Sequence, residues 1–311
     1  MSTAYIWEEL FTYHEMGYLH PESPKRLLSI KEVLESNGVG RELTKIDSRP
    51  ATKEEIAFIH DEVYIKRVEG TDGENLTHLD PDTSANRYSW KAAQLAAGSA
   101  IRCAEVVASG EHKNAFAFLR PPGHHAERDK AMGFCFFNNV AIAAEWLIRS
   151  KKADRVAIID FDVHHGNGTQ HAFSKRPDVL FVSSHRHPFF PGTGSEDEIG
   201  EGEGEGYTLN IPLKGGASDD DYKRVFDVVS RRVEKYRPNF ILASAGYDSH
   251  RADPLGGMDV TTDGFRYMMA RLVDLSREFS DGRLVAILEG GYNLKALRDS
   301  VEVQLEEMVS G

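Results

Sequence analysis

Short apolar runs that end in polar residues recur along this chain of 311 residues and alternate with helical patterns. Apolar runs without a polar alternation are typical of strands buried on both faces of a parallel sheet. We expect such strands at 115–119, 156–159, 179–184, 240–245 and 284–288, and a further strand at 207–213. Because no repeat or linker interrupts the alternation, it predicts a single α/β domain over residues 1–311 around a mainly parallel sheet.

Helical patterns fill the intervals between these strands and also occupy the N-terminal part of the chain. The first helix is expected to have Ser23 as its N-cap and Pro24 as its first residue. Arg26 would then lie in the first turn, where its simplest role is a surface charge. We expect a polar loop at 70–87 and helices at 53–68, 88–109, 138–149, 219–236, 262–279 and from 293 onward.

One group of polar residues directly follows the strand at 156–159 and could bind a metal ion. Alternate side chains on a strand point the same way, so Asp160, Asp162 and His164 are expected along one edge. An Asp-x-His pair offers one oxygen and one nitrogen ligand, which suits zinc and leaves positions for a third ligand and a water. Taken alone, such a pair is more often a solvated acidic strand end, so the rest of the chain decides.

Other polar groups follow the remaining strands. His124 and His125 come after the strand at 115–119 in a proline-bounded loop, where both side chains can reach one pocket. Ligands of parallel sheets bind beyond the carboxyl ends of the strands. The groups at 183–185, at Asp248 and at 291–292 are predicted to reach the same edge, which is hard to explain as surface decoration.

The charge balance excludes some classes of protein. The chain carries 37 Lys and Arg against 49 Asp and Glu, a net charge of −12, which disfavours nucleic-acid binding. An acidic surface would favour lysine-rich peptides or polyamines, although solubility alone is the commoner reason for it. The glycine-glutamate tract at 201–206 would repel phosphate, so we interpret it as a flexible acidic loop.

The ends of the chain and its cysteines point to the cytoplasm. Neither a signal peptide nor a stretch long enough to span a bilayer is found, so no membrane partner is expected. Cys103 and Cys135 are far apart, which supports neither a disulfide framework nor a cysteine zinc site. No stretch indicates the oligomeric state, and a homo-oligomer is left open.

Six motifs then occur in one order along essentially the whole chain: Arg-Pro-Pro-Gly-His-His-Ala (120–126), Gly-Phe-Cys-Phe-Phe-Asn-Asn (133–139), Asp-Phe-Asp-Val-His-His-Gly-Asn-Gly-Thr-Gln (160–170), Phe-Phe-Pro-Gly-Thr-Gly (189–194), Ala-Gly-Tyr-Asp (245–248) and Glu-Gly-Gly-Tyr (289–292). Together they resemble the zinc-dependent histone deacetylase family, which includes acetylpolyamine amidohydrolases. The resemblance implies an arginase-like, three-layer α/β fold and removal of acyl groups from N-acyl-lysine or similar N-acetylated amines.

The resemblance also implies metal sites. The zinc ligands would be Asp162, His164 and Asp248. One structural potassium ion would be surrounded by Asp160, Asp162, His164, Ser183 and the backbone of Ser184. A second potassium ion would be held with the help of Phe173, Val179 and Tyr207.

The implied catalytic residues act around the zinc ion. His125 resembles the general base and then acid, while His124 beside it supplies electrostatic stabilisation and a hydrogen bond. Asp160 would orient His124. Tyr292 would donate its phenol proton to the developing oxyanion, although a tyrosine after two glycines can also simply close a turn.

The implied substrate tunnel is narrow and apolar. Phe134 and Phe190 resemble its two walls, although lone aromatic residues more often belong to the core, and Gly133 would lie against the same methylene chain. Asp82 resembles a rim carboxylate that holds a peptide backbone, and Arg26 resembles an arginine that lines an internal acetate exit.

Two departures within the family matter. Asn167 stands where class I deacetylases carry an aspartate behind His125, and the 253–258 segment is likewise of class II type. A neutral amide there should leave His125 less readily protonated. Leu255 replaces the glutamate of a polyamine-selective relative, which weakens the case for a polyamine specialist.

Other hypotheses compete with a zinc deacetylase of acyl-lysine. An acetylpolyamine or other small N-acyl amine deacetylase would use the same tunnel. An arginase-type hydrolase with two metals would need extra carboxylates where the chain has Gly166 and Gly246. A non-catalytic acyl-lysine-binding protein is disfavoured by the complete set of metal ligands together with His125 and Tyr292.

Overall fold

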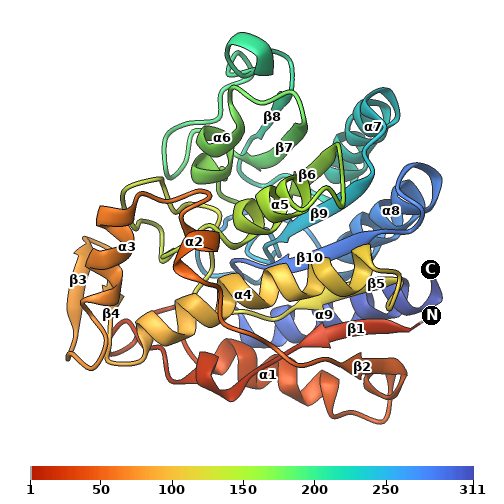
Figure 1. The fold of residues 1–311 in the computed structure, drawn as a ribbon. Coiled ribbons are helices and arrows are strands. Elements are labelled where there is room, and N and C mark those ends of the chain that lie inside the picture. Colours follow the sequence, from red (N-terminus) through yellow and green to blue (C-terminus); the bar gives the residue numbers. More distant parts are fainter. Residues whose placement is uncertain (1) are drawn as a thin grey trace.

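A computed structural model describes residues 2–311, and an eight-stranded sheet forms its centre (Figure 1). All neighbouring strands are parallel. The strands β5, β10, β9 and β6 are buried along their whole length, as the unbroken apolar runs predict. In spatial order the strands are β2 (Leu43–Lys45), β1 (Thr3–Ile6), β5 (Asn114–Ala117), β10 (Leu284–Leu288), β9 (Phe240–Ala245), β6 (Val156–Asp160), β7 (Val179–Arg186) and β8 (Thr208–Leu213).

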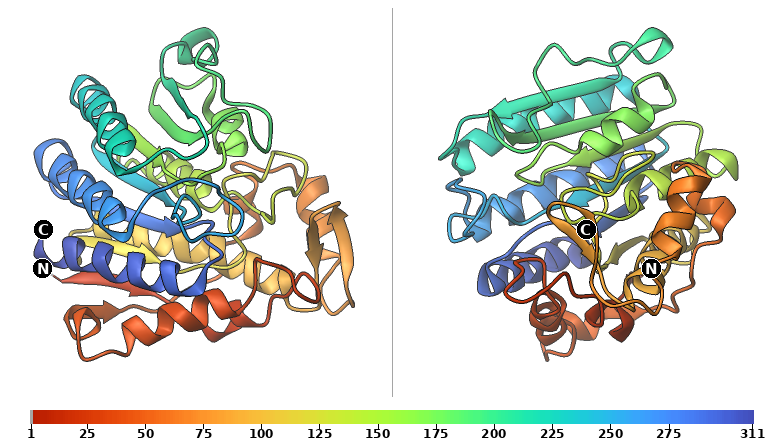
Figure 2. Two further views of the ribbon diagram at one scale, coloured as in Figure 1. Left: turned by 180° about the vertical axis from the view of Figure 1, so that it is seen from behind. Right: turned by 90° about the vertical axis from the view of Figure 1, so that its left-hand side faces the viewer.

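Helices cover both faces of this sheet and produce three layers (Figures 1 and 2). One layer is a row of helices in contact from one to the next, in the order α1 (Lys25–Leu34), α9 (Leu294–Ser310), α8 (Thr262–Phe279) and α7 (Asp219–Tyr236). The opposite layer contains α4 (Ser89–Ala108) and α5 (Asn139–Arg149), which pack against each other, and the short α6 (Asn167–Phe173) beside α5. Small side chains such as Ala96 and Ala100 are fully buried along α4 and allow close packing.

Local sequence signals account for the helix ends. Ser218 and Asp221 form a capping box at the start of α7, and Arg237 in left-handed conformation ends it. Asn138 caps α5 and Asn293 caps α9. Each side chain accepts a hydrogen bond from the backbone N–H three residues further along, at Ala141 and Ala296. The first helix begins one residue later than expected, with Pro24 as its N-cap residue.

The N-terminal part departs from the sequence predictions in three places. The prediction of a single helix at 53–68 is wrong, because α2 (Lys53–Ile56) and α3 (Glu62–Glu69) are separate helices. Between them the Asp61 backbone N–H donates to Arg128 O at 2.9 Å instead of to a helical carbonyl. The loop at 70–87 contains a hairpin of β3 (Thr77–Asp80) and β4 (Thr83–Ala85). Strands β1 and β2 were not expected.

Within residues 2–311, every helix is either too short or too polar to cross a bilayer.

Candidate active site

The polar motifs meet where the neighbouring strands β5, β10, β9 and β6 reach their carboxyl ends. The register pairs Asp160, the last residue of β6, with Ser183 on one side and Ser244 on the other. Asp248 follows the end of β9, and Tyr292 follows the end of β10. The parallel topology therefore gathers residues that are far apart in the sequence at one edge, as predicted.

A carboxylate–imidazole trio lies at this edge. Asp162, His164 and Asp248 each offer one ligand atom, and these atoms lie within 4.8 Å of one another. The Nδ1 atom of His164 is 3.1 Å from Asp162 Oδ1 and 3.2 Å from Asp248 Oδ2. Backbone amides orient both carboxylates, since Gly290 N donates to Asp162 Oδ2 at 2.9 Å and Val163 N donates to Asp248 Oδ1 at 2.8 Å.

The trio has the properties of a cation site. Asp248 Oδ2 is buried and accepts no hydrogen bond. Burial and the neighbouring Asp162 raise the pKa of Asp248 to about 7, since two buried carboxylates repel each other. A divalent cation would relieve this repulsion, and two carboxylates with one imidazole leave a position free, as in catalytic zinc sites. The residues therefore fit the zinc ion that the resemblance implies.

His124 and His125 lie side by side, with ring centroids 4.0 Å apart, in opposite electrostatic settings. His124 Nδ1 is 2.9 Å from Asp160 Oδ2. Although burial opposes protonation, Asp160 and Asp162 raise the pKa of His124. His125 Nδ1 is 2.7 Å from Asn167 Oδ1, and burial together with the adjacent His124 lowers the pKa of His125. One ring thus favours the charged form and the other the neutral form.

A narrow cavity of about 100 Å³ opens beside these histidines. The rings of Phe190 and His125 meet edge to face at 5.1 Å, and those of Phe134 and Tyr292 do so at 5.9 Å. Gly133 has φ +56°, and a Cβ atom there would lie 2.4 Å from His125 Cδ2. The cavity brings together these residues predicted from the sequence: Asp82, His124, His125, Gly133, Phe134, His164, Phe190, Leu255 and Tyr292.

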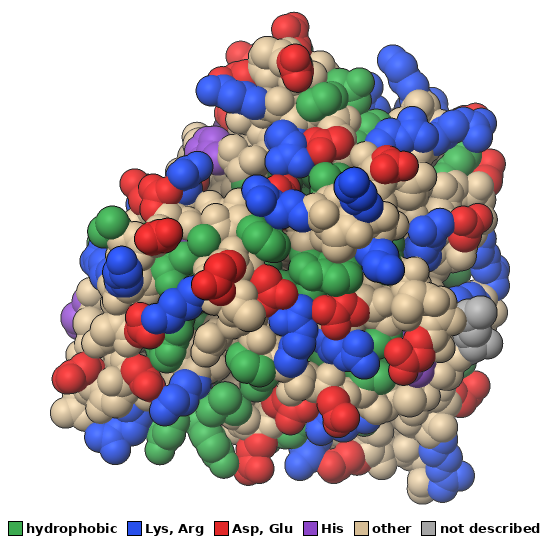
Figure 3. All heavy atoms as spheres, in the orientation of Figure 1, with side chains coloured by type: hydrophobic (Ala, Val, Ile, Leu, Met, Phe, Trp, Pro, Cys, Tyr) green, Lys and Arg blue, Asp and Glu red, His purple; other side chains and the backbone are tan. Residues whose placement is uncertain are grey.

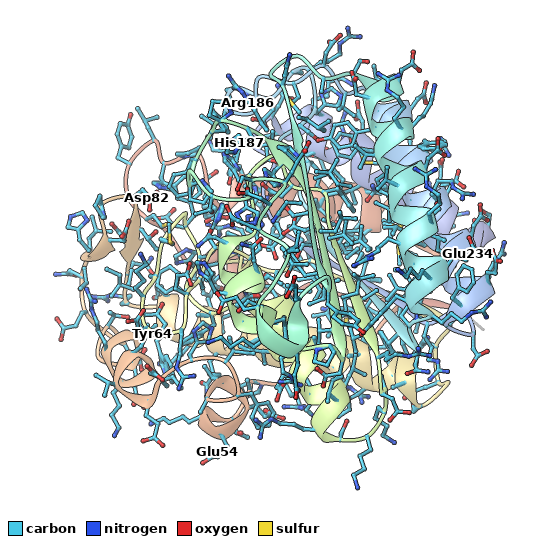
Figure 4. All side chains as sticks on the ribbon, turned by 90° about the horizontal axis from the view of Figure 1, so that it is seen from above. Glu54, Tyr64, Asp82, Arg186, His187 and Glu234 are labelled. Carbon is cyan, nitrogen blue, oxygen red and sulfur yellow. The ribbon has the colours of Figure 1, made fainter. Side chains whose placement is uncertain are left out.

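The mouth of the cavity combines apolar and acidic groups. Phe190 and Leu255 are 39% and 38% exposed. Asp82 lies in the turn between β3 and β4, and its Oδ1 accepts hydrogen bonds from Gly133 N at 3.1 Å and Thr83 Oγ1 at 2.8 Å. In Figure 4, Asp82 projects from the same side of the molecule as Arg186 and His187 at the end of β7.

The expectation that Arg26 is a surface charge is wrong, because its side chain is fully buried. Its Nε donates to Gly291 O at 2.7 Å, and its guanidinium carbon lies 5.2 Å from the centre of the Tyr292 ring. Glu22 provides the missing partner: its carboxylate binds Arg26 at 3.0 Å and Arg120 at 2.7 Å. The ion pairs offset the cost of burying the charges. Arg26 therefore lies behind Tyr292 and does not line the cavity.

The residues implied for potassium fall into two separate groups. Ser183 pairs with Asp160 across β6 and β7, and Ser184 Oγ donates to Asp160 O at 3.5 Å. Phe173 ends α6, Val179 begins β7, and Tyr207 precedes β8; the Tyr207 carbonyl accepts from Phe181 N at 2.9 Å. The first group adjoins the carboxylate–imidazole trio. The second group lies near the amino ends of strands β7 and β8.

Two acidic residues of the site were not predicted from the sequence. Glu289 is fully buried, its Oε2 accepts from Gly123 N at 2.7 Å and from His124 N at 3.1 Å, and burial raises its pKa to about 7. Its position directly after β10 was a usable signal. Asp253 Oδ2 accepts from Tyr292 N at 2.7 Å. Nothing in the sequence indicates this long-range contact.

The space around the trio leaves no room for additional carboxylates. A Cβ atom at Gly246 would lie 2.1 Å from Asp162 Oδ2, and one at Gly166 would lie 2.3 Å from Asp160 Oδ2. Side chains at these two positions would displace Asp162 and Asp160. The backbone thus argues against an arginase-type site with two metals.

Comparison with known proteins agrees with this geometry. A family model described as "Histone deacetylase domain" matches residues 20–308. A "Probable deacetylase" of Archaeoglobus fulgidus is 40% identical over 298 residues, covering 95% of this chain and 82% of that protein. "Histone deacetylase 15" of Arabidopsis thaliana is 43% identical over 319 residues, covering 99% of this chain, which spans only 57% of the plant protein.

A crystal structure of the HDA15 HD domain superimposes with a TM-score of 0.95 at 40% identity and covers 99% of this chain and 88% of that chain. This likeness confirms the predicted arginase-like α/β fold, with its parallel sheet between two helical layers. The match of motifs, sheet and pocket extends over nearly the whole chain, and the chain therefore belongs to the histone deacetylase family of amidohydrolases.

Proposed function

We propose that the chain is a zinc-dependent amidohydrolase that removes acetyl or other short acyl groups from N-acyl-lysine side chains or similar N-acetylated amines. One observation carries this proposal: His125 and Tyr292 line the same narrow cavity as His164, which is a member of the carboxylate–imidazole trio. A long, thin chain with a terminal amide suits a cavity of this shape. The proposal covers residues 1–311 as one catalytic domain.

Asp162, His164 and Asp248 would hold the zinc ion. When bound, zinc would polarise the acyl carbonyl and lower the pKa of a water molecule to about 7. The Oδ2 atom of Asp248 is buried, accepts no hydrogen bond and lies 3.2 Å from His164 Nδ1, which supports this assignment.

His125 is the proposed general base. Because its Nδ1 faces Asn167 Oδ1 at 2.7 Å, the Nδ1–H donates to the amide oxygen and Nε2 is left free to accept a proton from the attacking water. A lowered pKa keeps the ring neutral and ready for this step. The same Nε2–H would then protonate the departing amine.

His124 and Tyr292 are the proposed stabilisers of negative charge. Asp160, 2.9 Å from His124 Nδ1, favours the protonated ring, which would place a positive charge beside the developing oxyanion. The Tyr292 hydroxyl would donate a hydrogen bond to that oxyanion. Arg26 and Asp253 would fix the tyrosine from behind.

Substrate binding is assigned to the walls and mouth of the cavity. Phe134, Phe190 and Gly133 would enclose the methylene chain, Leu255 would contact it at the mouth, and Asp82 would accept hydrogen bonds from a peptide backbone.

Structural potassium would bind at Asp160, Asp162, His164, Ser183 and Ser184, and at Phe173, Val179 and Tyr207. We place the enzyme in the cytoplasm, since Cys103 and Cys135 are both buried and free.

The test is a comparison of kcat/KM for an acetyl-lysine peptide, acetylputrescine and acetylspermidine, with binding measured separately. We expect hydrolysis of at least one substrate and a preference for the peptide. The reason is that the mouth carries Leu255 at the position where a polyamine-selective relative has a glutamate. Preference for the polyamines would reassign the substrate. Binding of all three without hydrolysis would identify a non-catalytic acyl-lysine-binding protein.

A further inference from the structure

A second cavity, of about 340 Å³, lies at the amino ends of the strands. Its walls come from residues just before three strands and from the end of a helix. Arg155 precedes β6, Pro177 precedes β7 and Tyr207 precedes β8, and the last turns of α7 contribute Arg232, Lys235 and Tyr236. In Figure 4, Glu234 of this helix end projects on the side of the molecule away from Asp82. The cavity is therefore separate from the candidate active site.

Three cationic side chains line this cavity, and none has an acidic partner. Within residues 2–311, Arg155, Arg232 and Lys235 make no ion pair and no side-chain hydrogen bond to an acceptor. Arg176, next to the lining residue Pro177, is by contrast paired with Asp178 at 2.7 Å. Lys and Arg side chains gather over the end of α7 at the upper right of Figure 3. In a chain of net charge −12, the three cations without an ion pair outnumber the acidic side chain that lines the cavity, Glu205, so the local potential is positive.

Two packed tyrosine rings form an aromatic wall of the cavity, and one of the three cations lies over it. Tyr236 is buried, its hydroxyl donates to Pro177 O at 3.1 Å, and its ring packs edge to face against Tyr207 at 5.8 Å. The Arg155 guanidinium lies 5.9 Å from the centre of the Tyr236 ring. Glu205, from the acidic tract at 201–206, also lines the cavity. The three cations must outweigh its repulsion of an anion, while its carboxylate offers an acceptor for hydroxyl or amino groups.

We propose that this cavity binds a small phosphate-bearing metabolite. Guanidinium groups match phosphate oxygens in geometry and charge, the tyrosine rings offer a surface for a flat ring, and the volume falls within the range of about 300–1,000 Å³ that is usual for small-ligand sites. The limited volume of the cavity favours a small molecule over an acidic peptide. This inference does not depend on the reaction proposed for the active site.

The test uses calorimetric titration of the full chain in phosphate-free buffer with adenosine monophosphate, inorganic phosphate, adenosine and succinate. Adenosine monophosphate is expected to bind once per chain with a Kd below about 1 mM, inorganic phosphate more weakly, and adenosine and succinate not measurably. The double variant Arg232→Gln/Lys235→Gln should weaken phosphate binding about tenfold or more. Arg231→Gln, an equal charge change per site at a residue of α7 that does not line the cavity, should leave it unchanged.

Three results would overturn the proposal. The first is that neither phosphate probe binds. The second is that succinate binds as tightly as the phosphates. The third is that Arg231→Gln loses as much phosphate affinity as the double variant. Thermal unfolding and deacetylase turnover should be the same in all variants, because the cavity lies away from the catalytic residues. The binding comparison is made only between variants that meet this condition. Arg155→Gln, whose residue lies outside α7, repeats the test if the double variant unfolds.

Discussion

Asp253 Oδ2 accepts a hydrogen bond from the backbone N–H of Tyr292 at 2.7 Å, so the loop after β9 fixes the tyrosine that follows β10. The other carboxylate oxygen of Asp253 accepts from the backbone amides of Leu255 and Gly256. One side chain thus positions both Tyr292 and the residue at the mouth of the cavity.

Asp253→Ala is expected to lower kcat by about tenfold to a hundredfold, since a small displacement of a catalytic group has effects of this size. Asp259→Ala, in the same segment but half exposed and paired with Arg251, is the control. If Asp253 acts through the tyrosine, adding Asp253→Ala to Tyr292→Phe should cause little further loss. Fully additive losses would argue against the positioning role.

Asn167→Asp should move the acidic limb of the kcat/KM profile to higher pH by about one unit. A carboxylate 2.7 Å from His125 Nδ1 would raise the pKa of His125, and a base must be deprotonated to act, so activity would begin at a higher pH. The exposed Asn75→Asp serves as the control. An unchanged profile in Asn167→Asp would count against this pairing.

Gly133→Ala should reduce kcat/KM by about a hundredfold, because the added Cβ would lie 2.4 Å from His125 Cδ2 and displace the ring. Gly73→Ala is a matched control: Gly73 also has positive φ, at +81°, but nothing lies within 4 Å of the added atom. Both variants should lose about 1 kcal/mol of unfolding free energy from backbone strain. Only Gly133→Ala should lose activity, and equal activities would contradict the contact.

Acid should destabilise the fold through Glu22. Burial opposes its charged form, yet Arg120 and then Arg26 hold its pKa at about 2, below its ordinary 4.5. A lowered folded-state pKa gives stability that is complete above about pH 4.5 and is lost as the pH falls toward 2. Urea unfolding should show that Glu22→Gln costs about 3–5 kcal/mol at pH 7 and less at pH 3. The exposed Glu35→Gln should have almost no effect at either pH.

The sequence predicts the elements whose signals are local. The helix over 219–236 and the strands over 240–245 and 284–288 have the expected bounds, because their capping residues and unbroken apolar runs determine the structure without distant partners. The short strands β1 and β2 were missed, since four and three residues carry too little pattern. Their pairing is fixed by neighbours such as Asn114 in β5.

The same limit explains what was missed in the site. His124, His125 and Asp162 were identified because each follows an apolar run. The burial of Arg26 depends on Glu22 and Arg120, and Arg120 lies 98 residues beyond Glu22 in the chain. Only folding brings these charges together, so the isolated sequence around Arg26 predicted a surface position.

Hydrolysis is proposed to require one zinc ion held by the trio of Asp162, His164 and Asp248. The most direct measurement is the turnover of an acetyl-lysine peptide by protein stripped with a chelator and then titrated with zinc. We expect no turnover without metal, full recovery at one zinc per chain, and neither zinc binding nor turnover in Asp162→Ala. Turnover that survives complete metal removal, or zinc binding at this site without any hydrolysis, would contradict it.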